Sequence, residues 1–87
     1  MLRYVFQTNN AMTFPVSGPG SLGMEACVNN MVEPGDKAII AINGVFGTRM
    51  AEVTRRAGAE VITVENEWGT PVDPGKVETA LKANPDV

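Results

Sequence analysis

Hydrophobic and polar positions follow two different periods along the 87-residue chain, and together they predict alternating strands and helices. The run at 37–43 is nearly continuously apolar, as is typical of a parallel strand buried on both faces. Another strand is predicted at 60–65. The segments at 20–32, 45–57 and 74–83 carry apolar residues at helical spacings of three and four, which predicts amphipathic helices.

Breaker residues stand at the ends of these elements. The first of the three helices is expected to end at 33–35, because the residue before Pro34 avoids the helical region. Gly58 occupies the position after the second helix where glycine commonly ends a helix. Asp73 followed by Pro74 has the form of an N-cap with proline at the first helical position.

The first sixteen residues have a weaker pattern. Leu2, Val5 and Phe6 have the spacing of the last turns of an amphipathic helix. The short apolar run at 11–16 predicts a further strand. Pro15 cannot donate a ladder hydrogen bond, so we expect this strand to lie near an edge of the sheet or to pair poorly on one side.

The order strand, helix, strand, helix, strand, helix predicts an α/β fold with a parallel sheet and right-handed crossovers. Three strands leave both edges of such a sheet open. The chain also starts inside a helical pattern, and the breaker at 84–86 leads into what reads as the start of another strand. We therefore expect residues 1–87 to be a segment of a larger domain, truncated at both ends, rather than a complete small domain.

Composition excludes several classes of function. Hydrophobic residues make up 44% and charged residues 20%, and no apolar run approaches the roughly 20 residues that span a bilayer, so we expect no membrane association. The start of the chain lacks a secretory pattern, which favours the cytoplasm. The net charge is −3 and the basic residues are scattered, so we expect no nucleic-acid partner.

The chain has one cysteine, Cys27, and no histidine. An internal disulfide is therefore excluded, a metal site is not expected, and no Ser-His or Cys-His pair exists for nucleophilic catalysis. Cys27 lies between Ala26 and Val28 in a helical pattern, and we expect it to be a small packing residue rather than a nucleophile.

The stretch at 13–26 reads as an apolar strand that runs through a glycine-rich turn into a helix. Glycines allow close backbone approach, and the first N–H groups of a helix are free to bind an anion such as phosphate. The same residues also fit a plain turn with nothing bound. Gly18, Gly20 and Gly23 match the dinucleotide motif G-x-G-x-x-G, but the acidic residue that should end the second strand is replaced by Asn43.

Several short motifs along the chain resemble, in the same order and spacing, those of the class V aminotransferases. Within that class the alanine–glyoxylate, serine–glyoxylate and serine–pyruvate aminotransferases are the most similar. The motifs are Val5-Phe6-Gln7-Thr8, Ser17-Gly18-x-Gly20 with Glu25-Ala26, Glu33-Pro34-Gly35-Asp36, and Asn43-Gly44-x-Phe46-Gly47-x-Arg49.

The resemblance implies a piece of the large, cofactor-binding domain of a fold-type I enzyme, a three-layer α/β/α domain with a mostly parallel sheet. It implies pyridoxal 5'-phosphate as cofactor, with its phosphate held at Pro19, Gly20 and Ser21, and with Leu22 beside them. Pro19 has no N–H, so only Gly20 onward can serve from the backbone. Phe46, where relatives often have tryptophan, is expected to stack on the pyridine ring. The alternative role for Phe46 is that of a core aromatic beneath a loop.

Two further side chains receive structural expectations. Trp68, in the loop after the third strand, is expected to be a packing lid rather than a substrate contact. Arg49, one turn into its helix, is expected to have a surface or salt-bridge role rather than to clamp a substrate carboxylate.

The family's chemistry also needs a lysine that binds the cofactor as a Schiff base and an aspartate that pairs with the pyridine nitrogen. Both lie downstream of the matched region in the family, and neither Lys37, Lys76 nor Lys82 matches that lysine. The complete enzyme is expected to be a homodimer that moves an amino group from alanine or serine to glyoxylate or another 2-oxo acid. This piece is not expected to be active alone. A small non-catalytic phosphate- or NAD-binding module and an inactive truncation remain the alternatives.

Overall fold

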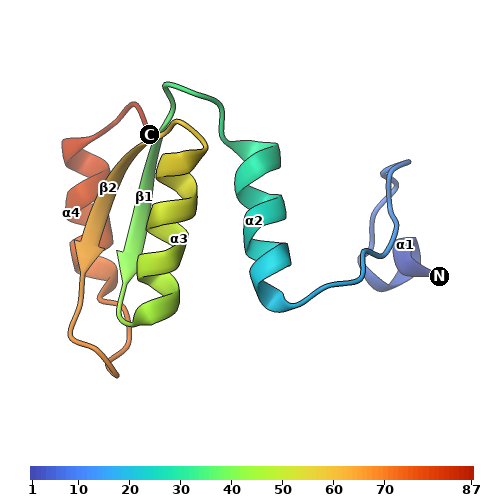
Figure 1. Cartoon of the computed structure of the whole chain (residues 1–87), viewed down its shortest axis with the longest axis horizontal. Coiled ribbons are helices and arrows are strands. Elements are labelled where there is room, and N and C mark those ends of the chain that lie inside the picture. Colours follow the sequence, from blue (N-terminus) through green and yellow to red (C-terminus); the bar gives the residue numbers. More distant parts are fainter.

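A computed structural model describes all residues from 1 to 87. It contains a short helix, a helix, and then strand, helix, strand and helix in alternation (Figure 1). The helices are α1 (Leu2–Val5), α2 (Gly20–Met31), α3 (Val45–Arg56) and α4 (Pro74–Ala83), and the strands are β1 (Lys37–Ile42) and β2 (Glu60–Glu65).

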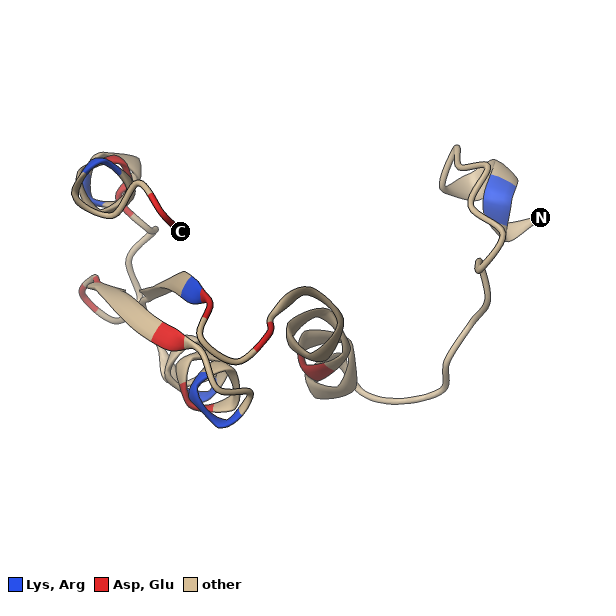
Figure 2. Cartoon of the chain, turned by 90° about the horizontal axis from the view of Figure 1, so that it is seen from above, with Lys and Arg blue, Asp and Glu red and all other residues tan.

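The two strands pair in parallel, in a register that sets Lys37 opposite Glu60 and Ile42 opposite Glu65. Helices α3 and α4 cover opposite faces of this sheet, and α2 packs against α3 (Figure 2). The three layers and the parallel pairing confirm the predicted α/β class. They follow from the sequence because a parallel pair requires a crossover, which α3 provides between β1 and β2.

The core lies between β1 and α3. Ile40, Ile42 and Ala51 form the buried cluster, and Met50 and Val61 pack against it while remaining partly exposed. The apolar run that predicted β1 therefore supplies the centre of the fold. Gly47 permits the close approach of α3 to β1, because a Cβ on Gly47 would lie 3.0 Å from the Cα of Ile42.

The turns between these elements are largely as the sequence indicates. Gly35 and Gly58 adopt φ values of 93° and 94°, which glycine tolerates without strain. Asp73 caps α4 with its side chain, which accepts a hydrogen bond from the N–H of Gly75 at 2.9 Å. The predicted N-cap and the predicted helix-ending glycine at position 58 are thus confirmed, whereas α2 ends at Met31, ahead of the expected 33–35.

The strand predicted at 11–16 does not form, so the sheet has two strands rather than three. The segment is irregular and belongs to no ladder, and the side chains of Met12, Phe14 and Val16 are exposed. A strand is stabilised by its neighbour, and here no strand of the chain lies alongside; Pro15 also removes one donor. The prediction of a paired strand at this position is therefore wrong, although the segment is apolar.

The expectation that Cys27 packs in the interior is also wrong, because its side chain is exposed. The only buried residue of α2 is Val28. Helix α2 touches no other helix or strand than α3, so most of its circumference remains open. The predicted N-terminal helix is present as α1, but it spans four residues, packs on no other element and leaves Val5 and Phe6 exposed.

The chain exposes more surface than a self-contained domain of its size. Its accessible surface is 6591 Å², whereas a folded monomer of this length exposes about 5000 Å². Its radius of gyration is 15.0 Å, compared with about 12 Å for a compact domain. The excess comes from the extended arm before α2, which Figure 1 shows standing away from the layered part.

Candidate functional site

The first turn of α2 offers free backbone donors. Its N-cap is Pro19, which is extended and provides no side-chain cap. The N–H groups of Gly20 and Ser21 donate to no preceding carbonyl, whereas that of Leu22 donates to the carbonyl of Pro19 at 3.0 Å. The hydroxyl of Ser21 also has no hydrogen-bond partner in the chain. Free N–H groups at the positive end of a helix dipole are groups that can bind an anion.

Glycine at position 18 shapes the wall next to these donors. A Cβ on Gly18 would overlap the side chain of Leu22 and would lie 3.0 Å from its Cβ. Leu22 therefore folds back over the turn, and a hollow of about 220 Å³ lies beside it. A Cβ on Gly20 would meet no atom within 4 Å, so the backbone beside the free N–H groups is open to a ligand.

Phe46 lies in the first turn of α3, directly after the carboxyl end of β1. Its side chain is 69% exposed, so in this chain it is not a core aromatic. The N-cap of α3 is Gly44, with an extended backbone and no side-chain cap. Phe46 thus presents an open ring face at the end of a parallel strand, where α/β proteins commonly bind their ligands.

The start of α2 and the start of α3 lie at the same end of the layered unit. Both β1 and β2 point toward this end, which is the lower end in Figure 1. Helices α2 and α3 pack against each other, so their N-termini belong to one face of the molecule. The fold therefore brings the first turn of α2 and the first turn of α3 to one end of the layered unit, although Ser21 and Phe46 lie 25 positions apart in the sequence.

Two asparagines hold the loops that follow β1 and β2, and neither role was predicted from the sequence. Asn43 donates from Nδ2 to the carbonyl of Thr70 at 2.8 Å. Asn66 is buried, donates to the carbonyl of Val64 and accepts from the N–H of Asp73 at 3.1 Å. The sequence does contain a signal for these roles, because each asparagine directly follows a predicted strand, and parallel strands end on the same side of a sheet.

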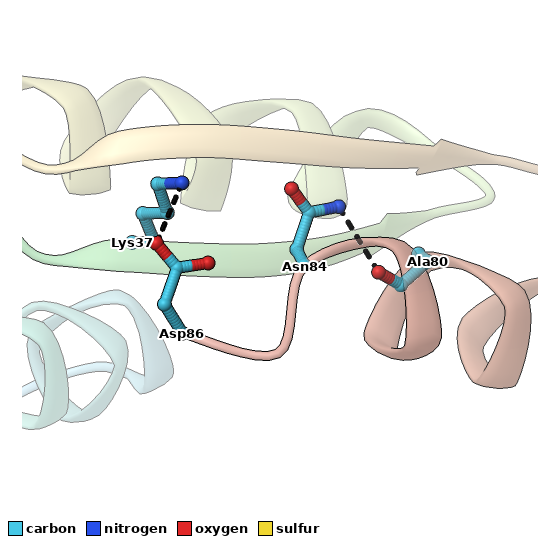
Figure 3. Close-up of polar contacts among 4 residues, drawn as sticks. All are labelled: Lys37, Ala80, Asn84 and Asp86. Atoms are coloured by element: carbon cyan, nitrogen blue, oxygen red, sulfur yellow. Dashed lines mark hydrogen bonds and ion pairs between the residues drawn. The ribbon is translucent and has the colours of Figure 1, made fainter.

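All three lysines already have partners. Lys37 forms an ion pair with Asp86 at 2.7 Å, and Lys82 forms one with Glu78 at 2.8 Å. Nζ of Lys76 donates to a main-chain carbonyl at the end of β2. Figure 3 shows the Lys37–Asp86 pair, which joins the start of β1 to the segment after α4.

This ion pair shifts the pKa of both partners. The hydrogen bond to Asp86, followed by its negative charge, raises the pKa of Lys37 above its ordinary value of 10.5. The hydrogen bond from Lys37, followed by Asp86's own backbone hydrogen bond, lowers the pKa of Asp86 below its ordinary value of 3.8. Both groups stay charged at neutral pH, so Lys37 is a structural cation and not a free amine.

Arg49 and Trp68 lie at the surface. Arg49 is exposed, forms no ion pair, and lines a polar groove of about 310 Å³ between α2 and α3. Arg49 was expected to have a surface or salt-bridge role, and it has the surface role. Trp68 is 65% exposed in the loop after β2, so it covers little of this chain. No three metal-ligating side chains lie together, and none of the helices has the length and apolarity needed to cross a bilayer.

Comparisons with known proteins give a consistent result, although no protein-family model matches the chain. The chain is 40% identical over 82 residues to a (S)-ureidoglycine–glyoxylate transaminase of Bacillus subtilis. It is 40% identical over 83 residues to an alanine–glyoxylate aminotransferase of Drosophila melanogaster. These matches cover 94% and 95% of the chain. The chain is a homologue of the class V aminotransferases.

Solved structures agree with this class V aminotransferase relationship. An alanine–glyoxylate aminotransferase from Nostoc sp. superposes with a TM-score of 0.79 at 44% identity and covers 94% of the chain. The ureidoglycine–glyoxylate aminotransferase of Bacillus subtilis superposes with a TM-score of 0.78 at 39% identity. The chain spans about a fifth of the length of the curated relatives, 20% and 21% for the two named above.

Proposed function

We propose that this chain is the part of an aminotransferase large domain that holds pyridoxal 5'-phosphate. The observation that carries the proposal is the pair of free N–H groups on Gly20 and Ser21, at the start of α2, together with the exposed ring of Phe46 at the start of α3. The two helix starts lie at the same end of the layered unit (Figure 1). The chain's 40% identity to glyoxylate aminotransferases supports the choice of cofactor.

The residues present fit the phosphate of this cofactor. Gly20 and Ser21 offer backbone donors, and the unpartnered Ser21 hydroxyl offers a third. Pro19 presets the turn without a donor of its own, and Leu22 packs over Gly18 beside it. Hydrogen bonds from such groups to a charged phosphate are short and strong, and the helix dipole adds to them.

Phe46 fits the ring of the cofactor. Its exposed face can stack on an aromatic ring, an interaction worth about 0.5–1.5 kcal/mol beyond simple burial. When bound, pyridoxal phosphate supplies the electron sink for chemistry at the substrate carbon. The role of this chain is to bind and orient that group.

We further propose that residues 1–87 are one segment of a homodimeric enzyme, continuing beyond both ends of the segment. The complete enzyme would move an amino group from alanine or serine to glyoxylate or another 2-oxo acid, in keeping with the names of the relatives. None of its three lysines, Lys37, Lys76 and Lys82, matches the family's Schiff-base lysine, so the chain alone should not catalyse transamination.

A dinucleotide site is the second candidate, because Gly18, Gly20 and Gly23 match its motif. Asn43 weighs against it. This residue stands where a carboxylate would bind the ribose hydroxyls, and its side chain already donates to Thr70.

The experiment uses the protein that the complete open reading frame encodes, including this chain. That protein is titrated with pyridoxal phosphate and, separately, with NAD. At 100 times its dissociation constant, a ligand stabilises the folded state by about 2.7 kcal/mol. Protection from thermal unfolding by pyridoxal phosphate is expected. Protection by NAD alone, or by neither ligand, contradicts the proposal.

Matched variants test the residues. Ser21→Ala removes a donor to a charged group, worth about 1.5–3 kcal/mol, and should weaken pyridoxal phosphate binding about tenfold or more. Ser17→Ala is its control, since that exposed hydroxyl also has no partner. Phe46→Ala should weaken binding about two- to tenfold. Phe6→Ala is the control here, because Phe6 is 70% exposed, close to the 69% of Phe46.

A further inference from the structure

Asn43 links two loops at the carboxyl edge of the sheet. Its Nδ2 donates to the carbonyl of Thr70 at 2.8 Å, and its own carbonyl accepts from the N–H of Gly69 at 3.3 Å. Asn43 is half-buried, which shields the side-chain bond from competing water. The two bonds hold the turn between β1 and α3 against the loop between β2 and α4.

The turn that Asn43 holds has no other side-chain anchor before Gly47, where α3 packs against β1. Gly44 follows in an extended conformation, caps α3 without a side chain, and leaves open space where a Cβ would be. The ring of Phe46 is 69% exposed, so packing does not fix it. The Asn43–Thr70 bond is the only side-chain hydrogen bond from residues 43–46 to another segment of the chain.

The loop on the other side of this bond is itself well anchored. Asn66 is buried and bonds to the N–H of Asp73 at the far end of the loop. The N–H of Asn66 donates to the carbonyl of Ile42 at 2.8 Å, and the N–H of Thr70 donates to the carbonyl of Glu67 at 3.2 Å. These bonds hold the loop in place, and with it the Thr70 carbonyl that accepts from Asn43.

We propose that Asn43 is a positioning residue for the cofactor ring: through its bond to Thr70 it fixes the turn that carries Phe46. This inference rests on the proposed function. It requires the carboxamide specifically, because Nδ2 must donate to a carbonyl. An aspartate of the same shape has no donor and sets a negative charge against the Thr70 carbonyl.

The test compares the parent protein with Asn43→Asp in the complete open reading frame. Asn9→Asp is the matched control, because Asn9 is exposed and its side chain has no hydrogen bond. Three quantities are measured: pyridoxal phosphate affinity, the circular dichroism induced in the bound cofactor's absorption band, and affinity for inorganic phosphate. The last probe uses only the α2 turn.

We expect Asn43→Asp to bind pyridoxal phosphate about five- to tenfold more weakly and to lose most of the induced signal. Inorganic phosphate affinity and the Asn9→Asp control should match the parent. If Asn43→Asp fails to fold, the neutral Asn43→Ala replaces it, with the same expected pattern.

Two results overturn the inference while leaving the proposed function intact. One is an unchanged induced signal in a folded Asn43 variant. The other is an equal loss of affinity for both ligands, which indicates general destabilisation instead of positioning. A parent protein that binds no pyridoxal phosphate overturns the proposed function and this inference together.

Discussion

Replacing Gly47 with alanine should reveal how closely α3 lies on β1. The new Cβ would be 3.0 Å from the Cα of Ile42 and 3.2 Å from the carbonyl oxygen of Ala41. Both are backbone atoms, so they cannot rotate away, and α3 must shift off the strand. Overpacking of this kind costs about 1–3 kcal/mol. The substitution also gains about 1 kcal/mol, because alanine favours the helix over glycine.

Gly23→Ala separates these two effects. Gly23 lies in the first turns of α2, and a Cβ there would meet no atom within 4 Å. This variant keeps the gain in helix propensity without the contact. Because both variants share the gain in helix propensity, the difference between them reports the overpacking alone. Gly47→Ala should therefore be less stable than Gly23→Ala by about 1–3 kcal/mol, and its melting temperature should be about 5–20 °C lower.

The assay is thermal unfolding followed by far-ultraviolet circular dichroism, with urea unfolding to check that the m-values agree. Gly23→Ala should melt above the parent and Gly47→Ala below Gly23→Ala. Equal melting temperatures for the two variants would refute the close approach of α3 to β1.

Two further predictions concern the periphery of the fold. The Lys37–Asp86 pair should add stability that is complete above pH 3.8 and below pH 10.5, because the pKa of Asp86 is lowered and that of Lys37 is raised. The pair's stabilisation is lost as pH falls below 3.8 or rises above 10.5. Urea unfolding midpoints measured across this pH range should show both losses in the parent and neither in Asp86→Asn. Asp73→Ala should destabilise α4 by about 1 kcal/mol, since the N–H of Gly75 loses its acceptor; an unchanged urea midpoint would contradict this.

Local signals in the sequence predicted most of the layered part. The apolar run of β1, the Asp73-Pro74 start of α4 and the glycine turn at Gly58 depend on neighbours a few residues away. Such features can be read from a window of sequence because propensity, capping and turn geometry are local properties.

The errors arose where the outcome depends on distant partners. Whether the segment at 11–16 pairs, and whether Cys27 is covered, depends on what lies beside them in space, which periodicity does not reveal. The Asn43–Thr70 bond joins residues 27 positions apart, so no short motif could contain it. The candidate site residues came from family resemblance, and only the fold shows that α2 and α3, which carry them, start at the same end of the layered unit.

The exposed segment before α2 has a consequence for synthesis. At about 5–20 residues per second, Phe14 is added to the growing chain roughly 2–10 s before β2 is made. Within residues 1–87 it stays exposed, as do its apolar neighbours Met12 and Val16. An extended apolar stretch is a template for aggregation, and a proline within it blocks one ladder hydrogen bond. Pro15 therefore makes this segment a poorer partner for copies of itself.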